Sequence, residues 1–550
     1  MSFVNSAAEF SLKRIVPDNM LRVLDTWMRR LEALSKGWLF LLTGVWLLWL
    51  SWLRPMTLPD EGRYAGIAWE MMRSGDRVVP LLNGMPFFHK PPLYYWLASA
   101  AFDVFGVHPW VARLPSWLAA WAAAMAVYVF MRRYRGARTA TIALMVLATQ
   151  PFFFGAAQFA NLDMLVAGMI TLTTVAGAAT VLNAVRGQPW RSLAVATGVL
   201  AALGVLSKGL IGVVLPAGIL FIWIAVLRQW RGLAALLWPP AIAAFLAVCL
   251  PWFWAMQQDF SGFFNYFFIY QQFDRFAETG FNNRQPIWFY LPVLAGLILP
   301  WTFWLGAVFR KAFWTAEQDD ARAVRLLLGI WIVVVLAFFS LPASKLVGYV
   351  LPTLAPLAGL VAEVIASGLA GRDADTTRRG YRACQAVAIS LCVLMTVFVA
   401  IYSSPTSAPM ARRARPEFKA GDQIVMLHAY AYDLPMNMRD TRPAWVVDDW
   451  SNPDIPLRDN WRKELYDAGQ FRPDVMKDTL ISMHELQARL CVAPAGQAFW
   501  FWGNPAEDQE TYPALRGVAP FAVNGKRALW RVVPDAAFRS RYCDGMPKNG

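Results

Sequence analysis

Long apolar runs recur along most of this chain, and they constrain its fold more than any other feature. A helix needs about 17–25 mostly apolar residues to cross a bilayer, and such runs recur between residues 38 and 403. With 57% hydrophobic and only 16% charged residues, the composition excludes a set of soluble domains. We predict a multi-spanning α-helical membrane protein with about 11 to 13 spans. The candidate spans are 38–53, 111–131, 139–155, 163–184, 191–206, 210–227, 232–256, 286–309, 324–341, 346–369 and 383–402, with 93–107 a shorter, marginal one.

The excess of positive charge indicates topology rather than a nucleic-acid partner. The net charge is +14, but Arg and Lys gather in short loops that alternate with poorer ones, which is the positive-inside pattern. The segment 1–36 is basic and amphipathic, so we expect it to lie on the cytoplasmic membrane surface. If the basic loops are cytoplasmic, the polar loops 55–92 and 257–285 share the opposite face. The basic loops are 132–138, 186–191, 228–231, 310–311 and 372–382.

The chain changes character after residue 403. The last part, 404–550, is rich in Pro, Asp and Arg and has no further apolar span. Strand-like runs alternate there with a helix-like stretch, 478–490, which predicts a soluble α/β domain on the side of the polar loops. The membrane domain would then be 37–403, and a disulfide between Cys491 and Cys543 is possible on an oxidising side. The strand-like runs are 423–428, 444–447, 498–502 and 528–533.

A group of charged residues follows the first apolar run. The acids Asp60 and Glu61 are adjacent, and Arg63 and Tyr64 come directly after them. Asp60 could simply cap a helix that begins after Pro59, because carboxylates accept amide hydrogen bonds there. Bases on the same face favour function instead, so we take Asp60 as a candidate catalytic acid and its neighbours as candidate substrate contacts.

The second polar group ends the same loop. Phe87, His89 and Lys90 precede two prolines, which hold the backbone stiff and extended. Lys90 could snorkel to bulk headgroups, or it could bind a substrate phosphate. His89 alone is a weak candidate for a metal ligand, since no second ligand stands at helical spacing from it.

Further ionisable residues are predicted on the same face. Asp163 begins an otherwise apolar run, where it either caps the helix or faces a cavity beside Asp60. Each cation taken singly could snorkel, but several on one face indicate a phospholipid or diphosphate-sized ligand. The candidate phosphate-binding residues are Lys90, Lys208, Arg275, Lys345 and Tyr349.

The order of these motifs resembles the GT-C class of membrane glycosyltransferases, which use polyprenyl-phosphate-linked sugars. Within that class the chain is most similar to the bacterial transferases that add 4-amino-4-deoxy-L-arabinose from undecaprenyl phosphate to lipid A. The resemblance covers most of 38–360, and its motifs are specific only in combination. They are Leu58-Pro59-Asp60-Glu61-Gly62-Arg63-Tyr64, Phe87-Phe88-His89-Lys90-Pro91-Pro92-Leu93, Arg113-Leu114-Pro115-Ser116, Leu162-Asp163-Met164, Ser207-Lys208-Gly209, Ser344-Lys345-Leu346 and Tyr349-Val350-Leu351-Pro352.

The resemblance implies a fold of about 13 spans with a C-terminal periplasmic α/β domain. It implies inner-membrane transfer of aminoarabinose to lipid A phosphates on the periplasmic side, which confers resistance to polymyxin and cationic peptides. Asp60 and Asp163 would be the catalytic acids, and the cations would hold the carrier phosphate. Relatives often have an acid where this chain has His89, and a histidine in the stretch before Arg275 that is missing here. A divalent metal is therefore an open option, and no cofactor is required.

Three alternatives remain from the residues. Another polyprenyl-phosphate sugar transferase, such as a protein O-mannosyltransferase-like or arabinosyl enzyme, would use the same loops. A lipid or sugar flippase would place charges along a path through the bilayer, whereas here they gather at one face. A signalling or assembly protein would leave the loop of carboxylates and cations unexplained.

Overall fold

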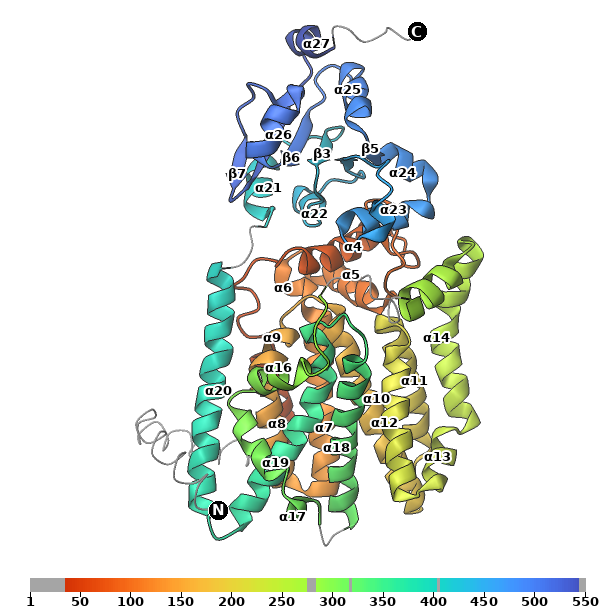
Figure 1. Cartoon of the computed structure of the whole chain (residues 1–550), viewed down its shortest axis with the longest axis vertical. Coiled ribbons are helices and arrows are strands. Elements are labelled where there is room, and N and C mark those ends of the chain that lie inside the picture. The colour runs from red at the N-terminus through yellow and green to blue at the C-terminus, as the bar shows by residue number, and fades with distance from the viewer. Residues whose placement is uncertain (1–34, 275–282, 316–318, 403–405, 544–550) are drawn as a thin grey trace.

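The computed structural model describes residues 35–274, 283–315, 319–402 and 406–543. The predicted amphipathic segment 1–36 therefore lies almost entirely outside the described residues. A helical bundle forms one end of the molecule and a sheet domain the other, and short helices lie in a layer between them (Figure 1).

Within the described residues, seven helices are long and apolar enough to cross a membrane. Two bent pairs raise the number to nine: α8 (Ala137–Ala148) with α9 (Pro151–Ala157), and α16 (Tyr290–Leu297) with η2 (Trp301–Ala307). Two shorter apolar helices, α3 (Lys36–Leu48) and α12 (Ile211–Leu227), accompany them. The seven are α7 (Leu114–Arg135), α10 (Leu162–Val185), α11 (Arg191–Lys208), α14 (Pro239–Asp259), α18 (Asp319–Ser340), α19 (Leu354–Ala370) with η3 (Val347–Thr353) before it, and α20 (Ala374–Tyr402).

Counted together, the seven helices, the two bent pairs and the two shorter apolar helices of the described residues give eleven candidate spans, the lower end of the predicted 11 to 13. The marginal run 93–107 is not among them, because it forms α5 (Leu93–Phe105), a helix of 13 residues and so about 20 Å long. It lies with α4 (Asp60–Ser74) in the layer between bundle and sheet domain (Figure 1). Counting 93–107 as a span would break the alternation of basic and polar loops, and the place of α5 in this layer removes that break.

The basic loops lie far from the sheet domain. Helices α13 (Trp230–Leu236) and α17 (Lys311–Trp314) stand at the opposite end of the bundle (Figure 1). Two arginines, Arg135 at the end of α7 and Arg325 in α18, converge on the buried Glu363 of α19 with Nε–oxygen distances of 2.5 and 2.9 Å. These two ion pairs therefore join α7, α18 and α19.

The C-terminal sheet has six strands in the order β5-β4-β3-β6-β8-β7. Strands β5, β4, β3 and β6 run parallel to one another, whereas β8 is antiparallel to both β6 and β7. The four predicted strands are confirmed to within one residue at each end, but β5 and β7 were not foreseen. The predicted helix 478–490 is interrupted: its first two residues end α24 (Pro473–Thr479), β5 follows, and α25 (Met483–Cys491) forms the rest. The strands are β3 (Gln423–Leu427), β4 (Trp445–Val447), β5 (Leu480–Ile481), β6 (Phe499–Gly503), β7 (Ala522–Asn524) and β8 (Arg527–Val532).

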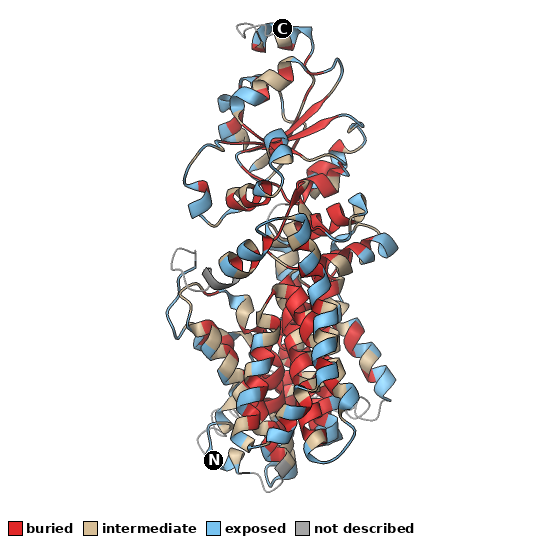
Figure 2. Ribbon diagram, turned by 90° about the vertical axis from the view of Figure 1, so that its right-hand side faces the viewer, coloured by how far each residue is buried: buried red, intermediate tan, exposed pale blue. Residues whose placement is uncertain are grey.

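The sheet domain packs against the layer of short helices that contains α4 and α5, which we call the loop layer, and the two share one hydrophobic core. Buried residues continue across the junction (Figure 2), where α4 and α5 pack with side chains of the domain such as Tyr432 and Leu465. A Cβ on Gly66 of α4 would lie only 2.8 Å from the Tyr432 carbonyl oxygen, so only glycine permits this approach. Asn83 donates to and accepts from the backbone of Ala444 at 2.9 and 2.7 Å. These contacts fix the domain relative to α4.

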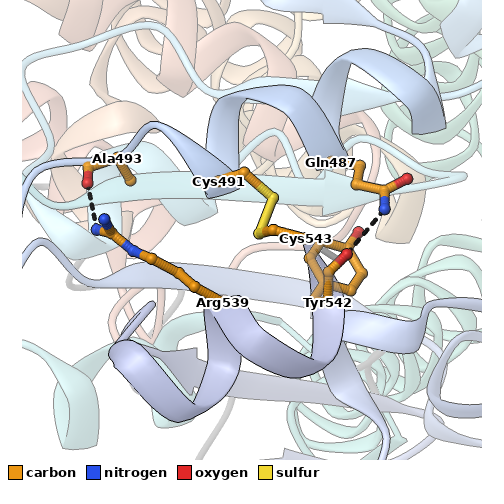
Figure 3. The surroundings of a disulfide bond; sticks show 6 residues. All are labelled: Gln487, Cys491, Ala493, Arg539, Tyr542 and Cys543. Atoms are coloured by element: carbon orange, nitrogen blue, oxygen red, sulfur yellow. Dashed lines mark hydrogen bonds between the residues drawn. A yellow bond between two sulfur atoms is a disulfide. The ribbon is translucent and has the colours of Figure 1, made fainter. Parts of the chain in front are cut away.

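A disulfide joins Cys491 at the end of α25 to Cys543 directly after α27 (Ala536–Tyr542). Figure 3 shows hydrogen bonds on either side of it, from Gln487 to the Tyr542 carbonyl and from Arg539 to the Ala493 carbonyl. The possible pairing is thus present in the structure.

Candidate functional site

A cavity of about 290 Å³ opens where the bundle, the loop layer and the sheet domain meet. Several parts of the chain that are distant in sequence contribute to it. They include the loop layer, the first turn of α10, the end of α11, residues 338–349 from the end of α18 into η3, and helix α23 (Trp461–Gln470) with the residues before it. Nine of the twelve predicted site residues line this cavity. They are Asp60, Arg63, Tyr64, Phe87, His89, Lys90, Asp163, Lys208 and Tyr349.

Asp60 is the first residue of α4 and does not act as its cap. The N-cap position is Pro59, and no side chain caps the helix there. The Asp60 carboxylate is 48% exposed, and its Oδ1 accepts a bond from Arg63 Nη2 at 3.0 Å. Asp60 is therefore accessible from the cavity and held there by Arg63.

Glu61 does not line the cavity, contrary to its predicted role in substrate binding. It is fully buried between Arg113, with Nε–Oε1 at 2.8 Å, and Arg54, with Nη1–Oε2 at 2.6 Å. Burial alone would raise the pKa of its carboxyl, but Arg113 and then Arg54 lower that pKa to about 2. Glu61 also accepts the backbone N–H groups of Thr57 and Ala160. It ties α4 to the bundle and so holds its neighbour Asp60 at the cavity.

Asp163 lies in the first turn of α10 and faces Lys208, the last residue of α11. The helix cap is Asn161, whose side chain accepts the Asp163 N–H at 2.7 Å, so the capping role belongs to Asn161. Asp163 forms an ion pair with Lys208, and Lys208 Nζ stands 4.9 Å from the ring centroid of Tyr349. The three predicted residues therefore form one contiguous wall.

His89 is stacked on Phe87 with ring centroids 4.6 Å apart. Its Nε2 lies 3.7 Å from Asp467 Oδ2, an oxygen that also accepts a bond from Tyr266. No group of three His, Cys, Asp or Glu side chains in the described ranges could hold a metal ion. The residues around His89 thus do not fit a metal site, and we derive no step through a metal.

Two predicted phosphate ligands are not part of the described cavity wall. Lys345 is buried, and its Nζ donates to the carbonyls of Gln285 and Pro342. It thereby joins the segment before α16 to the segment after α18. This lysine lies behind the cavity lining and has a structural role here. Arg275 lies outside the described residues.

The C-terminal domain supplies two cavity residues that the sequence analysis missed, Asp459 and Glu464. Glu464 Oε1 lies 2.6 Å from Arg63 Nη1. Arg63 is thus bound to a carboxylate of each domain, and the pKa of its guanidinium is raised because Glu464 in particular outweighs the lowering effect of burial. The charge-rich sequence of α23 was the available signal, but nothing in it indicated which surface it faces.

The cavity combines charges of both signs. Its lining includes the carboxylates of Asp60, Asp163, Asp459 and Glu464 and the cations of Arg63, Lys90 and Lys208. Such a mixture suits a ligand that carries both an anion and a cation better than it suits a simple anion. The exposed carboxylate of Asp60 thus shares one cavity with cations that can stabilise negative charge.

Comparison with known proteins finds similarity to glycosyltransferases. Residues 89–254 match the family model described as dolichyl-phosphate-mannose-protein mannosyltransferase. The chain is similar to the undecaprenyl phosphate-alpha-4-amino-4-deoxy-L-arabinose arabinosyl transferase 2 of Pseudomonas fluorescens, with 32% identity over 61% of each chain. A transferase of the same description from Sodalis glossinidius is 36% identical over 55% of this chain and 54% of its own. The chain therefore spans about three fifths of the relatives it matches.

Solved structures share the whole architecture. The crystal structure of ArnT from Cupriavidus metallidurans bound to undecaprenyl phosphate superposes with a TM-score of 0.75, covering 92% of this chain and 99% of that one at 22% identity. The apo form of the same protein gives a TM-score of 0.72 over 91% of this chain and 98% of that one, also at 22% identity. The resemblance predicted from the sequence motifs is thereby confirmed, and the fold is the predicted GT-C fold with its C-terminal α/β domain.

Proposed function

We propose that this protein is a glycosyltransferase that moves 4-amino-4-deoxy-L-arabinose from undecaprenyl phosphate to phosphate groups of lipid A. The observation that carries the proposal is the cavity whose lining brings the exposed Asp60 together with Arg63, Lys90 and Lys208. The curated relatives are named for this sugar and this lipid carrier, which supports the donor. The acceptor follows from the predicted resemblance.

The cavity charges suit the proposed donor. An aminoarabinose phosphodiester carries one negative charge on phosphate and one positive charge on its amino group. Lys90 and Lys208 offer ammonium groups to the phosphate, while carboxylates from both domains are available to the sugar ammonium. This division assigns the cations to the leaving group and the carboxylates to the sugar.

The reaction breaks the bond between the anomeric carbon and the carrier phosphate oxygen. The bonding electrons leave with undecaprenyl phosphate, and an oxygen of the acceptor phosphate forms the new bond to the anomeric carbon. Cations directed at the leaving phosphate stabilise the charge that develops there. A lipid A phosphate is already ionised, so Asp60 orients the acceptor or stabilises the developing positive charge on the sugar rather than removing a proton.

We place the site and the α/β domain on the periplasmic face of the inner membrane. The bundle has the apolar helices of a multi-pass membrane protein, and the basic helices α13 and α17 lie at the end away from the site (Figure 1), as the positive-inside pattern requires. The disulfide of the α/β domain suits an oxidising compartment. Transfer on that face would lower the negative charge of lipid A and give resistance to polymyxin.

The second candidate is a polyprenyl-phosphate sugar transferase with a hydroxyl acceptor. It is favoured by the family model over residues 89–254, whose description names protein mannosylation. In that case Asp60 would act as a general base, since a hydroxyl must lose its proton. A flippase is disfavoured because the ionisable residues that line the cavity lie together at one end of the bundle.

The test is mass spectrometry of lipid A from cells that lack their own transferase. Cells that express this protein are expected to carry lipid A heavier by one aminoarabinose, and cells that express Asp60→Asn are expected to lack that species. Asp103→Asn, in an exposed ion pair with Arg77, serves as the matched control and should behave as wild type. Unmodified lipid A in cells with well-expressed wild-type protein would contradict the proposal.

A further inference from the structure

We propose that helix α23 of the C-terminal domain is a working part of the catalytic site and that Glu464 is a positioning residue, which fixes Asp60 through Arg63. The inference rests on the proposed function, because it concerns the geometry of the same transfer reaction. It assigns the α/β domain a role in catalysis.

Arg63 bridges the two domains at the cavity. Its Nη2 donates to Asp60 Oδ1 at 3.0 Å and its Nη1 donates to Glu464 Oε1 at 2.6 Å. The exposed fraction falls from 48% for the Asp60 side chain to 18% for Arg63 and 11% for Glu464. Asp60, Arg63 and Glu464 thus form a chain of charges. Its exposed end is the candidate catalytic carboxylate of Asp60, and its buried end is Glu464 of α23.

The guanidinium of Arg63 is held in one orientation. Its central carbon lies 5.3 Å from the ring centroid of Tyr432 and 5.7 Å from that of Tyr64. The second carboxylate oxygen of Glu464 accepts a hydrogen bond from the Tyr432 hydroxyl. A planar guanidinium between two rings and two carboxylates has little rotational freedom. Its bond to Asp60 therefore has a defined direction.

The charge of Glu464 also matters for Asp60. Without Glu464, Asp60 is the carboxylate that remains on Arg63 among the described residues. The buried guanidinium would then draw Asp60 closer and compensate its charge more fully. By sharing Arg63, Glu464 leaves the Asp60 carboxylate directed at the cavity with charge available to the substrate. A shift of about 1 Å in such a group can lower the rate about 100-fold.

The position of α23 is set by contacts outside this chain of charges. Tyr266 in η1 (Asn265–Asp274) donates a hydrogen bond to Asp467 of α23 at 3.0 Å, and Phe471 at the end of α23 packs edge-on against Phe88. Because these contacts do not involve Glu464, a change at Glu464 can alter Asp60 while the domain stays docked.

The test is steady-state transfer from aminoarabinosyl undecaprenyl phosphate to lipid A by the purified full-length protein. Glu464→Gln keeps the shape of the side chain and removes its charge. We expect kcat to fall about 10- to 100-fold, while KM for the donor changes less than about threefold. In an Arg63→Gln background, Glu464→Gln should cause no further loss, because Glu464 acts through Arg63.

Two further variants separate positioning from folding. Glu417→Gln removes an exposed carboxylate of the same domain that lies 3.8 Å from Arg531, and it should leave kcat and the thermal transition unchanged. Tyr432→Phe keeps the charge of Glu464 but removes one of its hydrogen bonds, so it should lower kcat by less than Glu464→Gln does. This variant decides the matter if Glu464→Gln does not fold.

Wild-type kcat in Glu464→Gln, or losses that multiply in the double variant with Arg63→Gln, would overturn the positioning role. If Glu464→Gln does not fold, wild-type kcat in a folded Tyr432→Phe would overturn it as well. Failure of the proposed function is a separate result, since wild-type protein would then transfer no aminoarabinose at all. Glu464→Asp, which restores the charge on a shorter side chain, should recover part of the lost kcat if the charge on Arg63 is what matters.

Discussion

Lys208 at the end of α11 forms an ion pair with Asp163 in the first turn of α10, and its ammonium lies over the Tyr349 ring. The pair thus joins a carboxylate and a cation that the sequence places 45 residues apart. Both side chains are less than one fifth exposed, so each depends on the other for compensation of its charge.

We predict that Asp163→Asn lowers transfer activity at least about tenfold. With Asp163 neutral, the ammonium of Lys208 loses its carboxylate partner and its fixed place at the cavity. Initial rates with purified protein measure the effect, and the exposed pair of Arg77 and Asp103 gives the control, Asp103→Asn. Wild-type rates in Asp163→Asn would show that the pair is not needed for transfer.

Glu61 leads to a prediction about stability rather than chemistry. Glu61→Gln leaves two buried arginines without a carboxylate, which should cost about 3 to 5 kcal/mol of stability. Thermal unfolding in detergent, compared with the exposed variant Glu417→Gln, measures the loss. A transition temperature equal to that of wild type would contradict the structural role.

Glu61 should also make the stability of the fold depend on pH. The pKa of Glu61 is lowered to about 2 in the folded protein, so its stabilisation is present above the unfolded pKa of about 4.5 and is lost as the pH falls toward 2. The difference in stability between wild type and Glu61→Gln should therefore shrink below about pH 4.5. A difference that stays constant down to pH 3 would show that the ionised carboxylate of Glu61 is not the source of the stabilisation.

Glu70 should give a dependence of the opposite sign. Burial raises its pKa to about 7, although the N–H groups of Gly84 and Asn83 favour the ionised form. The folded state then holds a proton that the unfolded state has lost between about pH 4.5 and 7, so stability falls as the pH rises through that window. Glu70→Gln should flatten this slope, which thermal unfolding at several pH values would measure. An unchanged slope in Glu70→Gln would show that other groups cause this pH dependence of stability.

The sequence was sufficient for the bundle because span-length apolar runs have few other solutions. Positive-inside counting likewise brought Asp60, Asp163, Lys90 and Lys208 to one face before any geometry was known. It could not separate Asp60 from Glu61, because adjacent residues on a helix point in directions about 100° apart and only the position of Arg113 decides which is buried.

The contribution of the α/β domain could not be predicted in the same way. The contact between Arg63 and Glu464 joins residues 401 positions apart, and no local pattern in α23 records its partner. The role of Lys345 was also beyond prediction, since a lysine after a span looks the same whether it binds carbonyls or a ligand. Docking between distant segments decides both cases.

Gly348 provides a sharp test of the cavity wall. A Cβ at this position would collide with the Asp163 carboxylate, so Gly348→Ala must shift that carboxylate, which pairs with Lys208. We expect transfer to fall about 10-fold or more, with a smaller effect on the thermal transition than Glu61→Gln has. The matched control is Gly296→Ala, because a Cβ there meets no described atom within 4 Å. If Gly348→Ala transfers as fast as Gly296→Ala, the position of Asp163 beside Lys208 is not the one that supports the reaction.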